Sequence, residues 1–276
     1  MSKGCVFILS VSSDIGRALA LAYLNDGYEV IGTFRNRQSI VDLIGKQGLR
    51  LIPCDLDSKR SVGLMIDTYR KIYQSLHNSW DIFISCVGTM EPIDPFFSQD
   101  FNAWEESVEV NSTAQLRVLH GIYPYRRQCS VSSVVFFAGG GSNGPFTNYS
   151  AYAASKIFLT KMCELLDDEC GDLNPFIIGP GFRRTKIHNE TFNNSVSAGK
   201  NLSRTHFLFG SDCSDSSFND IYRFINWAVT QGKKVTGGRN FSVLHDEWRN
   251  GGLQLVKQLV EDENKFKLRR FLGEEE

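Results

Sequence analysis

Tyr152 and Lys156 are the residues whose types and spacing could most directly do chemistry. They stand in Tyr-Ala-Ala-Ser-Lys at the head of an apolar helical stretch. Residues four apart share one face of a helix, so the two side chains can act on one point. A neighbouring ammonium favours phenolate over phenol, which makes a tyrosine a usable acid near neutral pH. Because any helix can contain this pair, a buried tyrosine beside a solvated lysine is the other interpretation.

The elements that must position this pair alternate between strands and helices. Short apolar runs predict strands at Cys5–Leu9, Tyr28–Phe34, Leu49–Pro53, Asp81–Ser85, Ser132–Phe137 and Pro175–Ile178. Helical patterns occupy Ile15–Leu24, Ser39–Lys46, Ser58–Leu76, Phe101–Arg127 and Tyr149–Cys170. The alternation predicts a doubly wound parallel sheet with helices on both faces, which is a three-layer, Rossmann-type α/β fold.

We expect one domain over residues 1–250, followed by a charged, helix-forming tail over 251–276. Thr185–Ser217 is the one long irregular stretch and is rich in Asn, Ser, Gly and Thr. A loop of that length is usually a lid, a binding segment or disordered, and we interpret it as a substrate lid. The tail is interpreted as a solvated surface helix or a frayed terminus.

Composition narrows the class of protein. The 276 residues are 42% hydrophobic and 22% charged, enough to bury the core of one large domain. The net charge of -1 gives no field that favours nucleic acid or an anionic membrane. No apolar stretch reaches transmembrane length, and polar residues end the first apolar run too early for a signal peptide. Seven scattered cysteines without a C-x-x-C pair favour reduced thiols, a cytoplasmic location and no metal site.

Further motifs occur in a fixed order between these elements. They are Ser10–Gly16 (SVSSDIG), Cys54–Asp57 (CDLD), Ser85–Gly88 (SCVG), Asn111, and Pro180–Thr185 (PGFRRT). Together with Tyr152 and Lys156, they make the chain resemble the short-chain dehydrogenase/reductase family over about residues 4 to 245. The resemblance implies a nicotinamide-dependent oxidoreductase with its active site at the carboxyl ends of the strands. It also implies a homodimer or homotetramer, with Val235–Asp246 as a seventh strand at a subunit contact.

The family carries Gly-x-x-x-Gly-x-Gly in the turn after the first strand, where backbone N–H groups approach a pyrophosphate. Here only Gly16 remains, while Ser10 and Asp14 replace the other two glycines. The resemblance implies cofactor contacts from Ser10, Ser12, Ser13, Ile15 and Gly16. Asp14 would be a good N-cap, yet its charge would lie close to the pyrophosphate. A capped helix that binds no dinucleotide is the alternative.

The end of the second strand reads Gly-Thr-Phe-Arg-Asn-Arg and has no acid. NAD-specific relatives place an acid there to hold the ribose hydroxyls. The guanidinium fork of Arg35 can instead pair with a 2′-phosphate. We therefore expect Arg35 to favour NADP(H), with NAD(H) possible. A solvated arginine pair, Arg35 with Arg37, is the alternative.

The resemblance implies cofactor contacts at two further strand ends. Asp55, followed by Leu56, matches the family aspartate at the adenine, although it could equally cap a helix. Val87 and Gly88 lie where the family has Asn-Asn-Ala-Gly, a motif that shapes the sheet edge around the cofactor. Of that motif only the glycine is kept.

After the sixth strand, Pro180, Gly181 and Thr185 match the family's Pro-Gly-x-x-x-Thr, which meets the nicotinamide carboxamide. The following segment would be the lid. Its polar side chains, which suggest a hydroxylated or anionic substrate, are His188, Asn189, Asn193, Asn194, Lys200, Arg204 and His206. A solvated loop would explain the same composition.

Two positions concern proton transfer and the substrate oxygen. Asn111 matches the family's helix asparagine, which holds a water that links the active-site lysine to solvent. The family's catalytic serine stands thirteen residues before the tyrosine, but that position is Gly139 here. Its hydroxyl would donate to the substrate oxygen as charge develops there. Ser142 is the nearest candidate, backbone N–H groups of the glycine run are a second, and a loop without a donor is a third.

The expected function is an NADP(H)-preferring oxidoreductase that interconverts a carbonyl and an alcohol on a small polar substrate, with nucleotide-linked or acidic sugars as the first class to try. Tyr152 would transfer the proton, while Lys156 would lower the tyrosine pKa and hold the nicotinamide ribose. The alternative is a weakly catalytic or inactive NADP(H)-binding sensor or scaffold, because two glycines and the serine are replaced. Retention of Tyr152, Lys156 and Asn111 together favours the enzyme.

Overall fold

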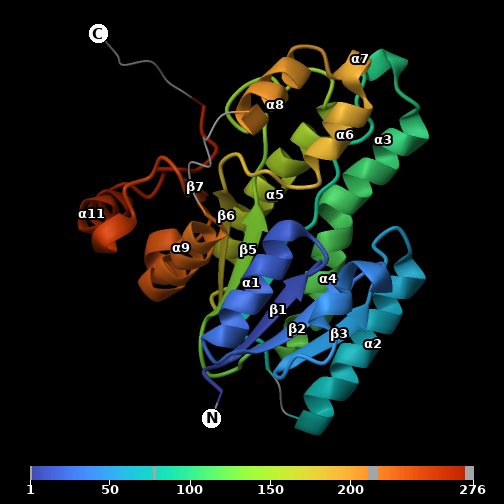
Figure 1. Cartoon of the computed structure of the whole chain (residues 1–276). Helices are drawn as coiled ribbons and strands as arrows, with labels where there is room; N and C mark the ends of the chain where they lie inside the picture. The colour runs from blue at the N-terminus through green and yellow to red at the C-terminus, as the bar shows by residue number, and fades with distance from the viewer. Residues whose placement is uncertain (1, 77–78, 211–216, 271–276) are drawn as a thin grey trace.

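In the part of the chain that the computed structural model describes, residues 2–76, 79–210 and 217–270, seven parallel strands form one sheet (Figure 1). They are β1 (Cys5–Leu9), β2 (Glu29–Phe34), β3 (Leu49–Pro53), β4 (Ile82–Ser85), β5 (Ser132–Phe137), β6 (Leu173–Gly179) and β7 (Asn240–Ser242). The order is β3-β2-β1-β4-β5-β6-β7. From β1 the sheet is extended through β2 to β3 on one side, and from β4 through β5 and β6 to β7 on the other. The strand order therefore reverses between β1 and β4, which is the point where ligands bind in doubly wound folds. The predicted fold class is confirmed.

Helices cover both faces of the sheet (Figure 1). One face carries α1 (Asp14–Asn25), α9 (Phe218–Gln231) and α11 (Leu253–Glu261), and the other carries α2 (Lys59–Leu76), α4 (Ala114–Ile122) and α5 (Ser150–Glu169). Side chains alternate along a strand, so Ile8 of β1 joins the first core and Phe7 joins the second. A π-helical turn, Glu109–Thr113, joins α3 (Phe101–Val108) to α4.

Several parts of the fold differ from the sequence expectation. The segment predicted as a helix over Ser39–Lys46 is a short 3₁₀ segment, Arg37–Leu43. The helix α9 was not predicted, although Ser217 and Asp220 form a capping box at its start. Its apolar face, which includes Phe224, is fully buried against the sheet. A short helix, α10 (Lys233–Thr236), then leads into β7, which is shorter than the strand expected over Val235–Asp246.

The predicted lid is helical and not irregular. Its described part forms α6 (His188–Asn193), α7 (Ser195–Ala198) and α8 (Lys200–Gly210), which lie over the carboxyl ends of the strands (Figure 1). Residues 211–216 lie outside the described residues. The lid has its own small apolar cluster with the body: Met90, Ile93, Tyr149, Tyr152 and Ala198. Burial of this cluster is what holds the short helices in place.

The tail is helical, as expected, but it is docked and not a solvated or frayed appendage. Leu255 and Leu259 of α11 are buried in the core. The guanidinium of Arg239 donates to the carbonyl of Leu259 at 2.7 Å, and Asn240 N–H donates to the carbonyl of Phe266 at 2.8 Å. The chain up to residue 270 is therefore tied to the sheet edge beside β7, while 271–276 lie outside the described residues.

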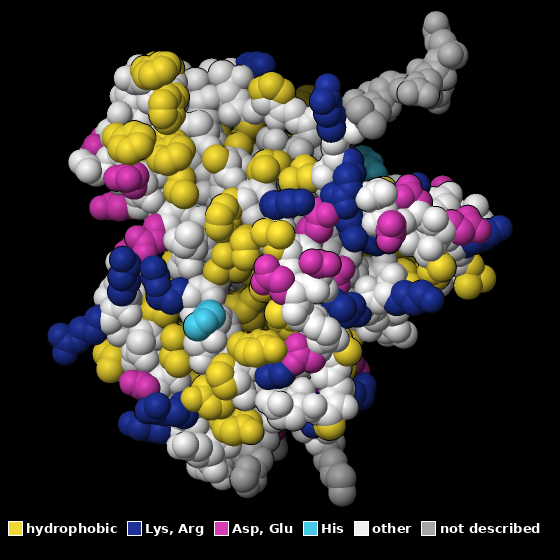
Figure 2. All heavy atoms as spheres, turned by 180° about the vertical axis from the view of Figure 1, so that it is seen from behind, with side chains coloured by type: hydrophobic (Ala, Val, Ile, Leu, Met, Phe, Trp, Pro, Cys, Tyr) yellow, Lys and Arg dark blue, Asp and Glu magenta, His cyan; other side chains and the backbone are white. Residues whose placement is uncertain are grey.

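On the face seen from behind, cationic and anionic side chains are interspersed (Figure 2). This agrees with the net charge of -1 and gives that face no field of one sign. No helix in the described ranges is both long and apolar enough to cross a lipid bilayer.

Candidate active site

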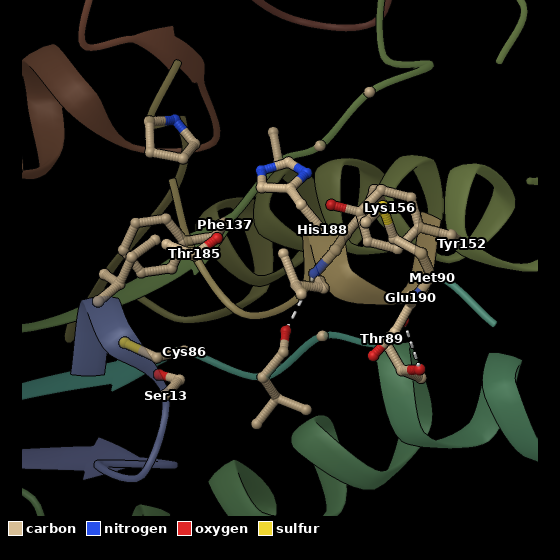
Figure 3. A pocket seen from close by; sticks show the side chains of 18 of the residues that line it. Ser13, Cys86, Thr89, Met90, Phe137, Tyr152, Lys156, Thr185, His188 and Glu190 are labelled. Atoms are coloured by element: carbon tan, nitrogen blue, oxygen red, sulfur yellow. Dashed lines mark hydrogen bonds between the residues drawn. The ribbon is translucent and has the colours of Figure 1, made fainter. Parts of the chain in front are cut away.

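A cleft of about 1630 Å³ opens at the carboxyl edge of the sheet, beneath the lid. Small-ligand sites typically measure about 300–1,000 Å³, so this space can hold a dinucleotide together with a small substrate. Ser13 and Cys86 lie on one side of the cleft, and Tyr152, Lys156 and Glu190 lie toward the other (Figure 3). The residues that the sequence predicted to contact the cofactor or to act in catalysis all line it, except Gly16, which lies buried in the turn below, and Asn111, which lies buried behind it.

Tyr152 and Lys156 occupy the first two turns of α5 and meet in the cleft as predicted. Lys156 is only 2% exposed, and its Nζ donates to the carbonyl of Val87 at 3.1 Å. Nζ lies 5.5 Å from the centroid of the Tyr152 ring. Burial lowers the pKa of Lys156 to about 8. The i, i+4 spacing is therefore sufficient to bring both groups to one wall.

The expected lowering of the tyrosine pKa is not found in this structure. Burial, followed by the charge of Glu190, raises the pKa of Tyr152 to about 12. Lys156 does not offset these two effects, because it is itself desolvated and directed at the Val87 carbonyl. Tyr152 is therefore held as a neutral phenol, which is the form that a proton donor needs.

Ser142 lies in the loop before α5 and is hydrogen-bonded within that loop. Its Oγ donates to the carbonyl of Gly139 at 2.8 Å, so the hydroxyl proton is used within the loop. Ser142 lines the cleft, but its role as a donor to the substrate oxygen stays a prediction. Gly139 lies directly against Tyr152: a Cβ built on it would stand 2.1 Å from the phenol oxygen.

Asn111 is fully buried in the π-helical turn between α3 and α4. Its Nδ2 donates to the carbonyl of Thr89 at 2.8 Å, and its Oδ1 accepts from Thr89 N–H at 3.0 Å. Insertions of this kind in a helix are frequent at functional sites. In this structure Asn111 fixes the loop after β4, which borders the cleft. The family role of holding a water stays a prediction.

The turn after β1 keeps its shape with serines. Ser10 adopts a left-handed backbone conformation with φ of 72°, where glycine is favoured. Ser13, and not Asp14, is the N-cap: its Oγ accepts from Gly16 N–H at 3.0 Å and donates to the carbonyl of Ser10 at 2.9 Å. A residue with a side chain does not fit at position 16, because a Cβ there would stand 2.2 Å from the carbonyl oxygen of Ser10. The prediction of Asp14 as the cap is wrong because Ser13 has the extended backbone of a cap and Asp14 is already helical.

Asp14 has a partner that the sequence did not predict. Its Oδ2 accepts from the backbone N–H of Lys186 at 2.7 Å, and Lys186 Nζ donates to the carbonyl of Ser12. Lys186 stands at the root of the lid, so a cation lies beside the turn that carries the extra carboxylate. This pairing between distant segments has no signal in the sequence.

Arg35 lies at the end of β2 and lines the cleft. Its Nη1 is 3.3 Å from Asp57 Oδ2, in an ion pair whose side chains are 72% and 52% exposed. Exposed pairs of this kind contribute at most about 1 kcal/mol, so the guanidinium can exchange its partner for a phosphate. Asp55 and Leu56 line the cleft next to it. Asp55 N–H donates to Ser61 Oγ at 2.9 Å, and its side chain accepts from Asp57 N–H at 3.3 Å, as in a turn-capping residue.

The remaining predicted cofactor positions, Val87, Gly88, Pro180, Gly181 and Thr185, also line the cleft. Val87 accepts from Lys156 Nζ through its carbonyl. Gly181 has a φ of 72°, which favours glycine at that turn. Among the expected lid residues, His188, Asn194 and Arg204 line the cleft and the other four do not.

Glu190 of α6 is the functional-site residue that the sequence reasoning missed. Its Oε2 accepts from Met90 N–H at 2.5 Å, Thr89 Oγ1 at 3.2 Å and Glu91 N–H at 3.2 Å (Figure 3). Burial raises the pKa of this carboxyl. The carboxylate thus fastens the lid to the loop after β4. An acid in a polar segment gives no sign in the sequence that it will point inward.

Comparison with known proteins agrees with this geometry. A family model described as short chain dehydrogenase matches residues 4–195, which include the turn after β1 and the Tyr152–Lys156 pair. The uncharacterized oxidoreductase YciK of Escherichia coli is 25% identical over 200 residues, covering 68% of this chain and 76% of that protein. The serine 3-dehydrogenase of Rhizobium radiobacter is 23% identical over 242 residues, covering 84% and 90%.

Solved structures share the architecture. A short chain dehydrogenase from Shigella flexneri, complexed with NADP, superposes with a TM-score of 0.71 at 20% identity, covering 88% of this chain and 98% of that one. At this identity the likeness shows the fold, while the family model carries the relationship by sequence.

Proposed function

This chain belongs to the short-chain dehydrogenase/reductase family, and from that membership we propose that it is an NADP(H)-preferring oxidoreductase of a small polar carbonyl and its alcohol. Members of the family are oxidoreductases that use a nicotinamide cofactor. The observation that carries the proposal is the shared cleft: the Tyr152–Lys156 pair lines the same space as the turn after β1. A non-catalytic fold would need neither side chain there.

The chain's own residues fit a bound dinucleotide at both ends of the cleft. Ser12 and Ser13 stand at the N-terminus of α1, where backbone N–H groups favour a pyrophosphate. Gly88 lines the cleft beside Lys156: a Cβ built on it would lie 3.4 Å from Ile187 Cδ1 and 3.8 Å from Lys156 Nζ. Arg35 would pair with a 2′-phosphate, and Thr185 would meet the nicotinamide carboxamide. When bound, the cofactor supplies or accepts the hydride.

The protein residues handle the proton. Tyr152, held as a phenol, would donate its proton to the substrate oxygen when the carbonyl is reduced. Lys156, fixed by the Val87 carbonyl, would hold the nicotinamide ribose. Asn111 would support both by fixing the loop after β4 and by holding a water.

The substrate end of the cleft supports a small polar substrate. Glu190, Asn194 and Arg204 line it from the lid. These groups can bind hydroxyl, ammonium or carboxylate substituents. The similarity to a serine 3-dehydrogenase supports a small hydroxy compound, and sugars are the second class to try.

The experiment that tests the proposal is Tyr152→Phe. The substitution removes one hydroxyl and leaves the ring, so we expect NADPH binding within about twofold of the natural chain and a loss of about 10²–10⁴ in kcat. Calorimetry measures the binding, and NADPH absorbance measures the turnover. A variant that keeps most of its kcat would show that the proton comes from elsewhere.

A second candidate, a cofactor-binding sensor or scaffold, is favoured by one observation. Ser142, the nearest candidate in the loop to replace the family serine, has its hydroxyl bonded to the loop itself. Such a protein would bind NADPH and reduce nothing.

A further inference from the structure

Gly139 stands where the family resemblance expects a hydroxyl, and the structure shows what occupies that space. A Cβ built on Gly139 would stand 2.1 Å from Tyr152 Oη, 2.5 Å from its Cζ and 2.6 Å from its Cε1. Real Cβ atoms essentially never come within 3.0 Å of a non-bonded atom. The edge of the phenol therefore lies directly against the Cα of Gly139.

Neither partner of this contact is free to withdraw. Ala138, the residue after β5, donates its N–H to the carbonyl of Ile178 at 2.9 Å. Gly139 follows directly, and its own carbonyl accepts from Ser142 Oγ at 2.8 Å. Further along the loop, Gly141 lies so close to α5 that a Cβ there would stand 2.8 Å from the Cβ of Ala153. The backbone of the loop is thus pressed onto the helix.

The tyrosine is fixed from its other sides. Tyr152 is 9% exposed and belongs to the apolar cluster beneath the lid. The ring of Phe146 lies 6.4 Å from its ring and stacks on Tyr149 at 4.2 Å. Two charged groups face it: Lys156 from α5 and Glu190 from α6. A side chain at position 139 would therefore overlap the phenol in this position.

We propose that Gly139 is a positioning residue: because it has no side chain, the Tyr152 hydroxyl can occupy the space that a serine hydroxyl at position 139 would take. This inference rests on the proposed function. The site then works with one side-chain hydroxyl at the substrate oxygen, where relatives with the family serine have two. The balance of the reduction is unchanged. The carbonyl carbon would gain a hydride from NADPH, which is oxidised to NADP⁺. The oxygen gains the Tyr152 proton, and the phenolate is reprotonated from solvent.

On this proposal, a serine at position 139 does not improve catalysis. Gly139→Ser adds a hydroxyl, but it also adds the Cβ that overlaps the phenol. Gly139→Ala adds the same Cβ without a hydroxyl. Both should displace Tyr152 toward the cleft, and a displacement of about 1 Å at a reacting group can cost about 10²-fold in rate.

The test compares these two variants with Gly144→Ala, a matched control in the same loop. Gly144 has nothing within 4 Å of a Cβ built on it. We expect kcat to fall about 10²-fold in Gly139→Ala and Gly139→Ser, with little change in NADPH affinity, while the control keeps its kcat. A Gly139→Ser protein with a kcat equal to or above that of the natural chain would overturn the proposal.

A second readout needs no turnover, so it separates this inference from the proposed function. In protein labelled at tyrosine Cζ, the Tyr152 resonance is identified by its loss in Tyr152→Phe and followed with pH. Burial raises the pKa of Tyr152 to about 12, so a phenol displaced toward solvent should titrate at lower pH in both Gly139 variants. An unchanged titration in both would contradict the contact, even if Tyr152 proves catalytic.

Thermal unfolding covers the case in which a variant folds poorly. Gly139→Ala should lower Tm in the natural background and have almost no effect in a Tyr152→Ala background, because the overlapped ring is gone. An equal loss of Tm in both backgrounds would show that the cost at position 139 has nothing to do with Tyr152.

Discussion

At the proposed substrate end of the cleft, Tyr152 and Lys156 are buried side chains of one helix. At the proposed cofactor end, Arg35 is an exposed side chain at a strand terminus. Lys156 is 2% exposed and Tyr152 9%, while the Arg35 side chain is 72% exposed. The first pair is held in place by packing and a hydrogen bond to Val87. Within the described residues, Arg35 is held by an exposed ion pair with Asp57.

The difference separates two ways of preparing a site. Burying an ammonium lowers the free energy of unfolding. Such a cost in stability is retained where the buried group is needed for activity. An exposed guanidinium costs little before its ligand arrives and gains a charge-assisted bond when it does. Substitutions at the two ends should therefore affect stability, binding and turnover in different proportions.

The largest effect should come from Lys156→Met, which replaces the buried ammonium by an apolar chain of similar length. Turnover should fall at least 10²-fold and NADPH affinity should fall as well. Yet at pH 7 the variant should be more stable by about 1–3 kcal/mol, because no charge is buried. Lys161→Met, on the same helix but exposed, is the control. It should leave turnover, NADPH affinity and stability nearly unchanged.

The same substitution has a pH signature. The pKa of Lys156, about 8 in the folded protein, lies below its ordinary value of 10.5. Between these values the unfolded chain binds a proton that the folded chain does not, so this lysine makes stability rise with pH from about 8 to 10.5. Denaturant unfolding should show that rise in the natural chain relative to Lys156→Met. Parallel stability profiles would contradict the burial of a charge.

The next effect concerns Arg35 at the other end. Arg35→Ala should weaken NADPH binding about tenfold and leave NADH binding nearly unchanged, because only NADPH carries the 2′-phosphate. Stability should change by less than about 1 kcal/mol. Arg37→Ala is the control, since Arg37 does not line the cleft. Calorimetry that finds equal or tighter NADH binding by the natural chain would sink the NADP(H) preference.

A smaller effect is expected where the lid meets the turn after β1. Lys186→Ala removes the cation that lies beside Asp14 and Ser12, so NADPH should bind about fivefold more weakly. Adding Asp14→Asn should restore part of this loss, because the carboxylate no longer opposes the pyrophosphate. Lys200→Ala, elsewhere on the lid, provides the control. A double variant weaker than Lys186→Ala would show that Asp14 helps and does not oppose binding.

The smallest effect should follow from Glu190→Gln. The amide can still accept from Met90 and Thr89 but without charge, so the lid loosens and KM rises about two- to fivefold. Because the Glu190 charge helps to raise the pKa of Tyr152, the loss of reductase activity at high pH should begin at a lower pH in the variant. A pH–rate profile checks this, and an unshifted upper limb would exclude coupling between the two groups.

The same contrast explains what the sequence could predict. The sheet, most of its helices and the Tyr152–Lys156 pair follow from periodicities within single segments, so they were predicted correctly. The turn after β1 was placed correctly, but its cap was not, because Ser13 and Asp14 are both good caps. Such choices depend on backbone angles that the sequence does not state.

What the sequence missed depends on partners from distant segments. Lys186 reaches Ser12, and Glu190 reaches the loop after β4, across separations that no local pattern records. The lid was predicted to be irregular because its helices are short and are stabilised by burial against the rest of the domain. The rise of the Tyr152 pKa escaped prediction for the same reason: it comes from burial and from Glu190, not from its neighbour on the helix.

The central claim is that this cleft turns over NADPH and does not merely bind it. The most direct measurement follows NADPH absorbance while the natural chain is presented with a panel of small polar carbonyl compounds, including 3-oxo acids, amino aldehydes and keto sugars, with Tyr152→Phe run in parallel. We predict substrate-dependent oxidation of NADPH by the natural chain for at least one class, abolished in Tyr152→Phe although that variant still binds NADPH. Tight NADPH binding without oxidation across the whole panel would contradict the account and favour a sensor or scaffold.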